Sequence, residues 1–410
     1  MASNGGPRCR GVFYRPSWRW KLKRMSSRWE LIELGRAVEF LSGGTPSKAE
    51  PDYWGGEIPW ISAASLHSEA VVTSERRVTD AAIGNGTRLA PVGSTLILVR
   101  GMSLLEEIRA GRVLRPVAFN QDVKALVPHE GTLYPPFLLY LVLANRRVLL
   151  SKVHQAGHGT GVLATEHLKS LSVAVPAIEE QRRIAGVIGA LDDLAEADNA
   201  LATTSEVLAQ ALVDRSGSSV PLADCASERR DPVRPVGACD HYSLPAFDDG
   251  FLPARCDGST IKSGKNVVAG PSVLVSRLNP HIPRVWMAYP EPGVLSVAST
   301  EFVVVEAQGV PAEWVWAACS SPGFVAAMQQ RVTGTTGSHQ RVDKAALMTI
   351  PVADPHGVPE TTVNAVTQLV RHAHELRLEA VQLRRTRDEL LPLLMSGRVR
   401  VGEVSGGEDS

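Results

Sequence analysis

The 410-residue sequence has few cysteines, no long apolar run and no excess of charge of either sign. Its five cysteines are too widely spaced for a disulfide framework or for the paired ligands of a zinc site. The longest apolar runs, such as residues 137–144, are far shorter than the ~20 residues that cross a bilayer. The N-terminus lacks the apolar segment of a signal peptide. These absences predict a cytoplasmic protein with reduced thiols and no membrane partner.

The 43 basic and 43 acidic residues balance, so the chain as a whole has no positive field. Seven of the basic residues precede Met25, in a stretch without any acid. Two interpretations of residues 1–24 stay open. They form a basic arm that contacts phosphates, or they result from a start codon upstream of a natural beginning at Met25. The second is favoured, and no site is assigned there.

The sequence contains an internal repeat. Residues 168–176 resemble residues 343–351, which lie 175 positions further on, and both lead into a long helical pattern. Residues 93–100 resemble residues 270–277 at an offset of 177. Landmarks that recur at nearly one offset indicate two copies of one unit. We therefore expect two mixed α/β (α+β) domains, each followed by a long helix.

Short apolar runs bounded by glycine and proline predict strands within each copy. The clearest are residues 94–99, 123–127, 273–275 and 302–305. Amphipathic patterns predict helices over residues 136–150 and 312–328. The predicted divisions are an extension at 1–28, domains at 29–176 and 216–352, long helices at 177–215 and 358–398, and a tail at 399–410.

Both long helices carry apolar residues at heptad spacing. The predicted seam of the first, which polar Asp198 and Ser205 interrupt, comprises Ile184, Val187, Leu191, Leu194, Leu201 and Leu208. In the second helix a leucine recurs at every seventh position, at Leu369, Leu376, Leu383 and Leu390. Two seams of similar length pair most simply as an antiparallel coiled coil. The alternative is that each helix is buried in its own domain.

A helix of ~35 residues is ~50 Å long, because each residue adds ~1.5 Å. One turn of B-DNA is ~34 Å, so such a spacer between duplicated domains would suit the reading of two separated half-sites on one duplex.

Catalytic motifs are incomplete throughout the sequence. Tyr134-Pro-Pro-Phe has the prolines and the aromatic residue of an amino-methyltransferase motif but lacks its polar residue. Residues 258–266 approach a phosphate loop, yet Asn266 stands where Ser or Thr would hold magnesium. His154, His158 and His167 have no nearby cysteine or acid to complete a metal set. The sequence therefore predicts no catalytic residue, no metal and no cofactor of its own.

Several ordered motifs are similar to one family. LGRAVEFLSGGTPSK (34–48) and YWGGEIPWIS (53–62) resemble the opening of a type I restriction–modification specificity subunit. VAVPAIEEQRRI (173–184) resembles that family's junction between target-recognition domain and conserved helix, and RDELLPLLMSG (387–397) resembles its C-terminal helix ending. Segments 241–247, 270–280 and 299–302 are similar to another branch of these recognition domains. The likeness covers roughly residues 29–398. The second junction departs from the family, since residues 351–359 replace its acidic, glutamine-rich turn.

The resemblance implies two target-recognition domains separated by an antiparallel coiled coil, in a non-catalytic subunit that reads double-stranded DNA. Each domain would recognise half of a bipartite target. Two modification subunits using S-adenosylmethionine, and ATP- and Mg-dependent restriction subunits, would carry out adenine methylation and cleavage. Two rival functions stay open: a stand-alone DNA methyltransferase or nuclease with duplicated recognition domains, and a coiled-coil scaffold that binds no DNA.

Candidate DNA contacts are cations for phosphates and polar side chains for base edges, on loops near the repeated landmarks. In the first domain they are Thr45, Ser47, Lys48, Arg100, Asn120, Gln121, His158 and Thr160. In the second they are Lys262, Lys265, Arg277, Asn279, His281, Arg284, Thr336, His339 and Arg341.

Both domains are nearly neutral, with 14 basic and 14 acidic residues in 29–176 and 11 and 12 in 216–352. We therefore expect the chain alone to bind DNA only modestly. Residues 177–215 carry 3 basic and 8 acidic groups. Their acidic flank is either a docking face for modification subunits or a solvated helix surface.

Overall fold

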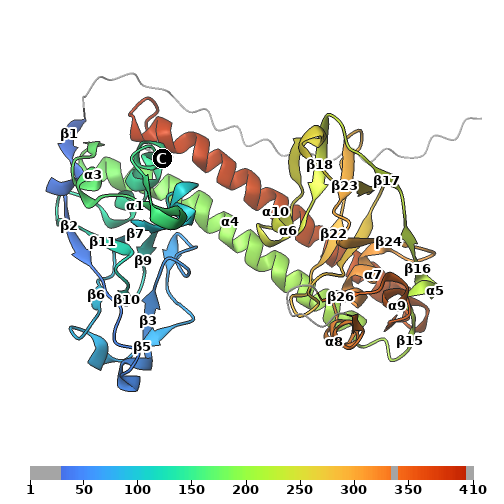
Figure 1. Ribbon diagram of the computed structural model, residues 1–410. Helices are drawn as coiled ribbons and strands as arrows, with labels where there is room; N and C mark the ends of the chain where they lie inside the picture. The colour runs from blue at the N-terminus through green and yellow to red at the C-terminus, as the bar shows by residue number, and fades with distance from the viewer. Residues whose placement is uncertain (1–28, 334–339, 403–410) are drawn as a thin grey trace, which may run out of the picture. The chain divides into compact units, whose positions relative to one another are not determined.

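The computed structural model describes residues 29–333 and 340–402 of the chain (Figure 1). It divides into two compact units, one of residues up to Asp192 together with those from Arg385, and one of Asp193–Arg384. We call residues 29–176 head 1 and residues 216–352 head 2. Each unit holds one head and a part of both long helices, α4 (Ile178–Val213) and α10 (Glu360–Met395).

The main sheet of head 1 has five strands in the order β2-β11-β7-β9-β4. Its central strand β7 is buried along its whole length because α1 packs against β7 and β9. Residues 137–143 of α1 are all buried as well. The elements are β2 (Val38–Ser42), β4 (Ala70–Val71), β7 (Thr95–Leu98), β9 (Ala110–Val113), β11 (Val123–Pro128) and α1 (Pro135–Ala144).

A second sheet of head 1 has the order β5-β3-β10-β6 and its own small core around Trp60, Val78 and Ala118. A three-stranded sheet, β12-β13-β8, and a pair, β1-β14, complete the head. The bounds are β1 (Glu30–Glu33), β3 (Trp54–Ile61), β5 (Arg77–Val78), β6 (Arg88–Ala90), β8 (Arg100–Gly101), β10 (Val117–Phe119), β12 (His154–Ala156), β13 (Thr160–Val162), β14 (Ser172–Val175), α2 (Arg146–Leu150) and α3 (Thr165–Lys169).

Head 2 also has two main sheets, with the orders β16-β24-β21-β22 and β17-β20-β23-β18-β19, and two strand pairs, β15-β27 and β25-β26. Its strands are β15 (Ser219–Pro221), β16 (Ala226–Arg229), β17 (Pro232–Val233), β18 (Ala238–Tyr242), β19 (Ala254–Asp257), β20 (Lys265–Val267), β21 (Ser272–Ser276), β22 (Val285–Ala288), β23 (Leu295–Ala298), β24 (Phe302–Ala307), β25 (Val332–Thr333), β26 (Arg341–Val342) and β27 (Pro351–Ala353). Its helices are α5 (Leu222–Cys225), α6 (Leu244–Asp248), α7 (Ala312–Cys319), α8 (Pro322–Gln330) and α9 (Lys344–Met348).

The two heads share one topology. Four strands of the head 1 sheet, β2-β11-β7-β9, are matched in order by β16-β24-β21-β22. The pairs β1-β14 and β15-β27 each precede a long helix, α4 in one copy and α10 in the other. The sequence repeat thus corresponds to a repeated mixed α/β domain. None of the helices within residues 29–333 and 340–402 is long and apolar enough to span a membrane.

Two predicted helices are each divided in two. Residues 136–150 form α1 and α2, and residues 312–328 form α7 and most of α8. At the first break the Asn145 side-chain amide donates to the carbonyl oxygen of Leu141 (2.8 Å). At the second, the Ser321 hydroxyl accepts from the backbone NH of Phe324 and Pro322 begins α8. The prediction of continuous helices was wrong because these polar and proline residues favour helix ends.

The helices α4 and α10 pack against each other in an antiparallel sense. In the first unit Arg387 contacts Asp192 (3.1 Å), and in the second Arg377 donates to Glu206 (2.8 Å), so residue numbers rise along α4 as they fall along α10. The packing of the long helices as a coiled coil agrees with the sequence prediction.

The structure corrects the seam of α4. Leu194, Leu201 and Leu208 are 46–49% exposed, whereas the residue after each of them, an alanine in every case, is at most 1% exposed. Alanine permits close approach of α10, and Ala202 clusters with Ala373 and Leu376. Polar Asp198 and Ser205 lie in this buried seam. The register prediction followed the large residues, one position away from the residues that α10 covers.

Other predicted seam residues are covered to different degrees. Ile184 is fully buried and Leu376 is 7% exposed. The remaining predicted positions are half-buried: Val187, Leu191, Leu369, Leu383 and Leu390.

Candidate nucleic-acid interface

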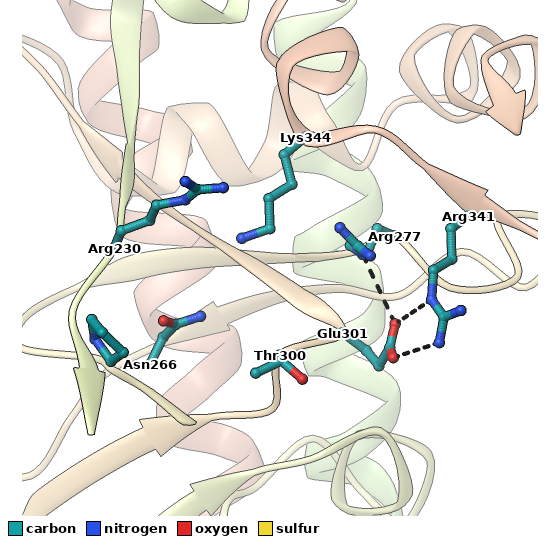
Figure 2. Close-up of a pocket in the computed structure, with 8 residues that line it drawn as sticks. Arg230, Asn266, Arg277, Thr300, Glu301, Arg341 and Lys344 are labelled. Carbon is teal, nitrogen blue, oxygen red and sulfur yellow. Dashed lines mark hydrogen bonds and ion pairs between the residues drawn. The ribbon is translucent and has the colours of Figure 1, made fainter. Parts of the chain in front are cut away.

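Head 2 contains a pocket of about 430 Å³ that is lined mainly by polar and cationic side chains (Figure 2). The lining residues come from segments far apart in the sequence. They are Arg230, Pro232, Asn266, Arg277, Thr300, Glu301, Arg341 and Lys344. Four of the eight are cations, so the chemistry of the lining suits an anion.

Backbone hydrogen bonds at the end of β21 bring these segments together. The Arg277 NH donates to the carbonyl oxygen of Glu301 (2.9 Å), and its own carbonyl oxygen accepts from the NH of Val342 (3.0 Å). Leu278 forms an isolated bridge with Arg341. Backbone hydrogen bonds alone therefore hold Arg277 between the start of β24 and β26, independently of any side-chain contact.

Two carboxylates compensate part of the positive charge. Glu301 accepts from the Arg341 guanidinium at 2.8 and 3.1 Å and lies 3.9 Å from Arg277 Nε. The hydrogen bond from Arg341 lowers the pKa of Glu301 despite partial burial. Burial alone would raise the pKa of Glu228, but hydrogen bonds from Lys344 (2.6 Å) and Arg230 (3.1 Å) outweigh it and lower that pKa. Both acids are therefore charged near neutral pH.

Four of the predicted head 2 contacts lie together. Residues 277–281 run beside residues 340–341, which places Arg277, Asn279, His281 and Arg341 in one region. The Asn279 NH donates to the Gln340 carbonyl oxygen, and a His281 ring nitrogen lies 2.9 Å from Gln340 Oε1. Asn279 has a φ of 49°, in the left-handed region that asparagine tolerates better than most residues.

Other predicted head 2 contacts have different surroundings. Lys265 is 6% exposed, donates to the Ser263 hydroxyl, and has a pKa lowered by burial. Arg284 makes two hydrogen bonds to Asp248 (2.7 and 2.8 Å). Lys262 is exposed on the loop before β20. Thr336 and His339 lie outside the described residues.

The predicted loop of head 1 is held by close backbone packing. A Cβ on Gly43 would lie 2.1 Å from the Phe119 carbonyl oxygen, so only glycine fits there. The Trp60 indole NH donates to the Gly44 carbonyl oxygen (3.1 Å). Thr45 then donates to Gln121 (2.9 Å), which joins two predicted contacts. Ser47 and Lys48 continue the loop and are exposed.

A second group in head 1 lies on β8 and β13. These strands pair with Val162 opposite Arg100, so exposed Arg100 and half-buried Thr160 are on neighbouring strands. Asn120 is 5% exposed, donates to the Asp122 carboxylate (2.9 Å), and accepts from the Asp122 NH (3.1 Å). Its hydrogen bonds shape the turn before β11. The side chain of His158 lies outside the described part of the structure.

Six of the eight pocket residues of head 2 were not predicted: Arg230, Pro232, Asn266, Thr300, Glu301 and Lys344. Lys344 belongs to the repeated segment 343–351, so the repeat itself could have drawn attention to it. Arg230 follows another arginine in a charged stretch, and no local pattern marks it. Within residues 29–333 and 340–402, no group of three or more His, Cys, Asp or Glu side chains is arranged to hold a metal ion.

Comparison with known proteins identifies relatives of this chain. A family model described as the type I restriction modification DNA specificity domain matches residues 26–203. The EcoR124I/EcoR124II specificity subunit of Escherichia coli, a type I restriction enzyme subunit, is 32% identical over 164 residues, which are 39% of this chain and 40% of that protein. The type I MjaIX specificity subunit of Methanocaldococcus jannaschii is 28% identical over 172 residues, 41% of this chain and 39% of that protein. The matched segment thus spans about 40% of the length of these relatives.

A solved structure extends the likeness in fold. The crystal structure of the S subunit of a type I restriction–modification system from M. genitalium covers 91% of this chain and 98% of its own, with 12% identity and a TM-score of 0.55. At this identity the likeness concerns the fold alone. Residues 26–203 thus match the type I restriction modification DNA specificity domain, and the chain is similar in sequence to two type I specificity subunits over about 40% of their length.

Proposed function

We propose that this chain is the DNA-specificity subunit of a type I restriction–modification complex and that it has no catalytic activity of its own. The observation that carries the proposal is the DNA specificity domain in residues 26–203. The repeated topology of head 2 adds a second domain of the same design, outside the matched segment. Two such heads suit a target of two half-sites, each read by one head.

The long helices support a measuring role. Each is 36 residues long, which corresponds to about 54 Å of α-helix. We infer that this antiparallel pair sets the number of base pairs between the half-sites. The proposal requires the two helices to behave as one rigid element, which the buried alanine seam favours because close packing leaves little freedom.

Partner subunits would supply the chemistry: two modification subunits with S-adenosylmethionine, and restriction subunits that need ATP and Mg. Leu194, Leu201 and Leu208 form a half-exposed apolar stripe on α4 at heptad spacing. Acidic residues flank this stripe on the same helix. We infer that an amphipathic helix of a modification subunit docks along the stripe. Such an assembly would act on cellular DNA, which agrees with a cytoplasmic location.

Mapping methylated adenines in cells that express the chain with its modification partner tests the proposal. We expect one bipartite motif with a constant spacer, and no methylation when the chain is omitted. Exchange of residues 29–176 for the corresponding domain of a relative should change one half of the motif and leave the other half intact. Methylation or cleavage by the purified chain alone would overturn the proposal, as would a methylated motif that does not depend on the chain.

A further inference from the structure

We propose that the head 2 pocket seats one phosphate group of the DNA backbone, through Arg230, Arg277, Arg341 and Lys344, and that head 1 has no corresponding seat. This inference rests on the proposed function, because it assumes that head 2 binds DNA. The ligand chemistry is a phosphate oxyanion. Its source is the sugar–phosphate backbone, since Asn266 and Thr300 on the lining are the neutral donors that commonly accompany cations at backbone phosphates.

The charges are arranged around the cavity and not within it. Arg277 and Arg341 lie with Glu301 on one side of the view, and Arg230 and Lys344 lie toward the other (Figure 2). Glu228, which pairs with Arg230 and Lys344, is not among the lining residues. The cavity therefore faces four cations and a single carboxylate. Bringing like charges together costs free energy that an entering oxyanion would recover.

Two of the four cations are already largely removed from water, whereas the side chain of Arg230 is 71% exposed. The side chain of Lys344 is 18% exposed and that of Arg277 is 27% exposed, so little water needs to leave them on binding. Arg277 Nε is buried and has no hydrogen-bond partner within the described residues. A buried donor without an acceptor is costly. Because Nε is buried, the Arg277 side chain would have to turn toward the cavity before this donor could reach a phosphate oxygen. Guanidinium groups suit this role because their planar donors match phosphate geometry.

The end of β7 in head 1 has the same backbone hydrogen bonds as the end of β21 in head 2. The NH groups of Val99 and Arg277 donate to the carbonyl oxygens of Asp122 and Glu301. The carbonyl oxygens of Val99 and Arg277 in turn accept from the NH groups of Leu163 and Val342. These hydrogen bonds make Val99 the counterpart of Arg277.

The same alignment extends to the other three cations. Strand register places Leu41 opposite Ala125 and Arg229 opposite Val304, so Ser42 is the counterpart of Arg230. Counting from Leu163 and Val342 gives Val162 for Arg341 and Thr165 for Lys344. In this register none of the four counterparts carries a charge. The sequence repeat runs in a different register, at offsets of 177 and 175, and aligns Arg277 with Arg100 and Lys344 with Lys169. The backbone hydrogen bonds shift these two pairings by one and four positions. The pocket is thus a property of head 2 and not of the shared fold.

A phosphate seat contributes affinity without sequence information. Its loss should weaken binding to every duplex by a similar factor and reduce the slope of log K against log salt by about 1. Base discrimination should not change. These expectations separate a phosphate seat from a base-reading pocket, whose loss would relax specificity at one position.

The test uses the full chain with its modification partner and a 40-bp duplex that carries the mapped target, beside a duplex without it. Arg230→Gln combined with Lys344→Gln should weaken binding to both duplexes about tenfold at ~0.15 M salt and lower the salt slope by about 1. Arg230→Lys keeps the charge and should retain most of the affinity. Arg234→Gln removes an exposed arginine of the same head outside the pocket, and should have a small effect.

Thermal unfolding of each variant checks that head 2 still folds. If the double variant folds and binds both duplexes as the wild type does, or if Arg234→Gln weakens binding equally, the phosphate seat is refuted while the proposed function stands. If the wild-type complex binds neither duplex, the proposed function itself fails. Calorimetric titration with inorganic phosphate separates the two sources of the oxyanion. Saturable binding at micromolar phosphate that Lys344→Gln abolishes would assign the pocket to a free anion and overturn the backbone assignment.

Discussion

Head 1 and head 2 share the order of four strands in one sheet and the same backbone hydrogen bonds at the end of the strands β7 and β21, yet the side chains there differ in chemistry. Head 2 has four cations around a cavity, and the positions of head 1 that are equivalent in the hydrogen-bond register carry no charge, although Arg100 directly follows one of them. At the strand edge next to this position, head 1 has a glycine loop packed tightly against Phe119.

The difference shows that the fold determines which loops lie next to each other, whereas the side chains on those loops vary between the heads. Asp122 and Glu301 illustrate the point. The backbone carbonyl oxygen of each accepts a hydrogen bond from the NH of the residue that ends a central strand. In head 1 the Asp122 carboxylate bonds to its neighbour Asn120, whereas in head 2 the Glu301 carboxylate bonds to Arg341. One backbone position thus completes a turn in one head and holds a pocket cation in the other. We therefore expect substitutions that disturb loop geometry to have the larger effect in head 1, and substitutions that remove charge to have the larger effect on DNA binding in head 2.

The largest effect should follow from Gly43→Ala in head 1. The added Cβ would lie 2.1 Å from a backbone oxygen that already accepts hydrogen bonds from Gly44 and Thr87, so the strand end or the loop must move. We expect a loss of at least about 3 kcal/mol of stability, confined to the first unit, because overpacking against backbone relaxes poorly. Calorimetry with hydrogen exchange would locate the change.

Gly186→Ala is the matched control in the same unit. Gly186 is exposed on α4 and no atom lies within 4 Å of a Cβ placed there, so alanine should stabilise the helix by up to about 1 kcal/mol. Equal destabilisation by both substitutions would show that the loop is not specially constrained.

A second prediction compares the helix pair in the two units. Arg387 is 8% exposed and contacts Glu69, Asp192 and Asp388. Arg377 pairs with one carboxylate among the described residues, that of Glu206, and lies over the ring of Phe251. Arg387→Met would leave three carboxylates facing one another, at a cost of about 3 kcal/mol. Arg377→Met should cost less, about 2 kcal/mol, because a single carboxylate remains.

Denaturant unfolding followed by hydrogen exchange in each unit measures both effects. Exposed Arg385, on the same helix, serves as the control, and Arg385→Met should change stability by less than about 0.5 kcal/mol. The comparison fails if Arg377→Met proves the more damaging of the two arginine substitutions.

Much of the architecture follows from patterns in the sequence. Repeated segments at nearly one offset gave two copies of an α/β domain, and heptad spacing gave two long helices that pack together. The detailed register did not follow, because the pattern highlights large residues. On α4 the buried seam contains Ala195 and Ala202, and the neighbouring Leu194 and Leu201 are half-exposed. Sequence alone cannot tell a helix packed closely through alanine from one packed through leucine.

The site was predictable only in part. Arg277 and Arg341 lie beside repeated landmarks, so the sequence marks them as candidates. Arg230 and Lys344 join the same pocket because strand pairing brings β16 and the start of α9 to the end of β21. That convergence depends on contacts between residues more than 100 positions apart, which no local pattern records. The predicted DNA contacts themselves stay predictions until binding is measured.

The smallest expected effect comes from transferring charge between the heads. Ser42→Arg with Thr165→Lys would place two cations in head 1 at the counterparts of Arg230 and Lys344. If the fold presents these positions to DNA in both heads, the variant should bind duplex DNA a few-fold more tightly, with a salt slope steeper by about 1. The neutral control Ser42→Gln with Thr165→Gln adds polar bulk without charge and should bind like the wild type.

The gain should be smaller than the loss in head 2. Lys124 donates to Ser42 in head 1, so the new arginine would be repelled by a neighbouring cation that head 2 lacks. An unchanged salt slope in the charged variant, with folding intact, would mean that equivalent positions in the two heads face DNA differently.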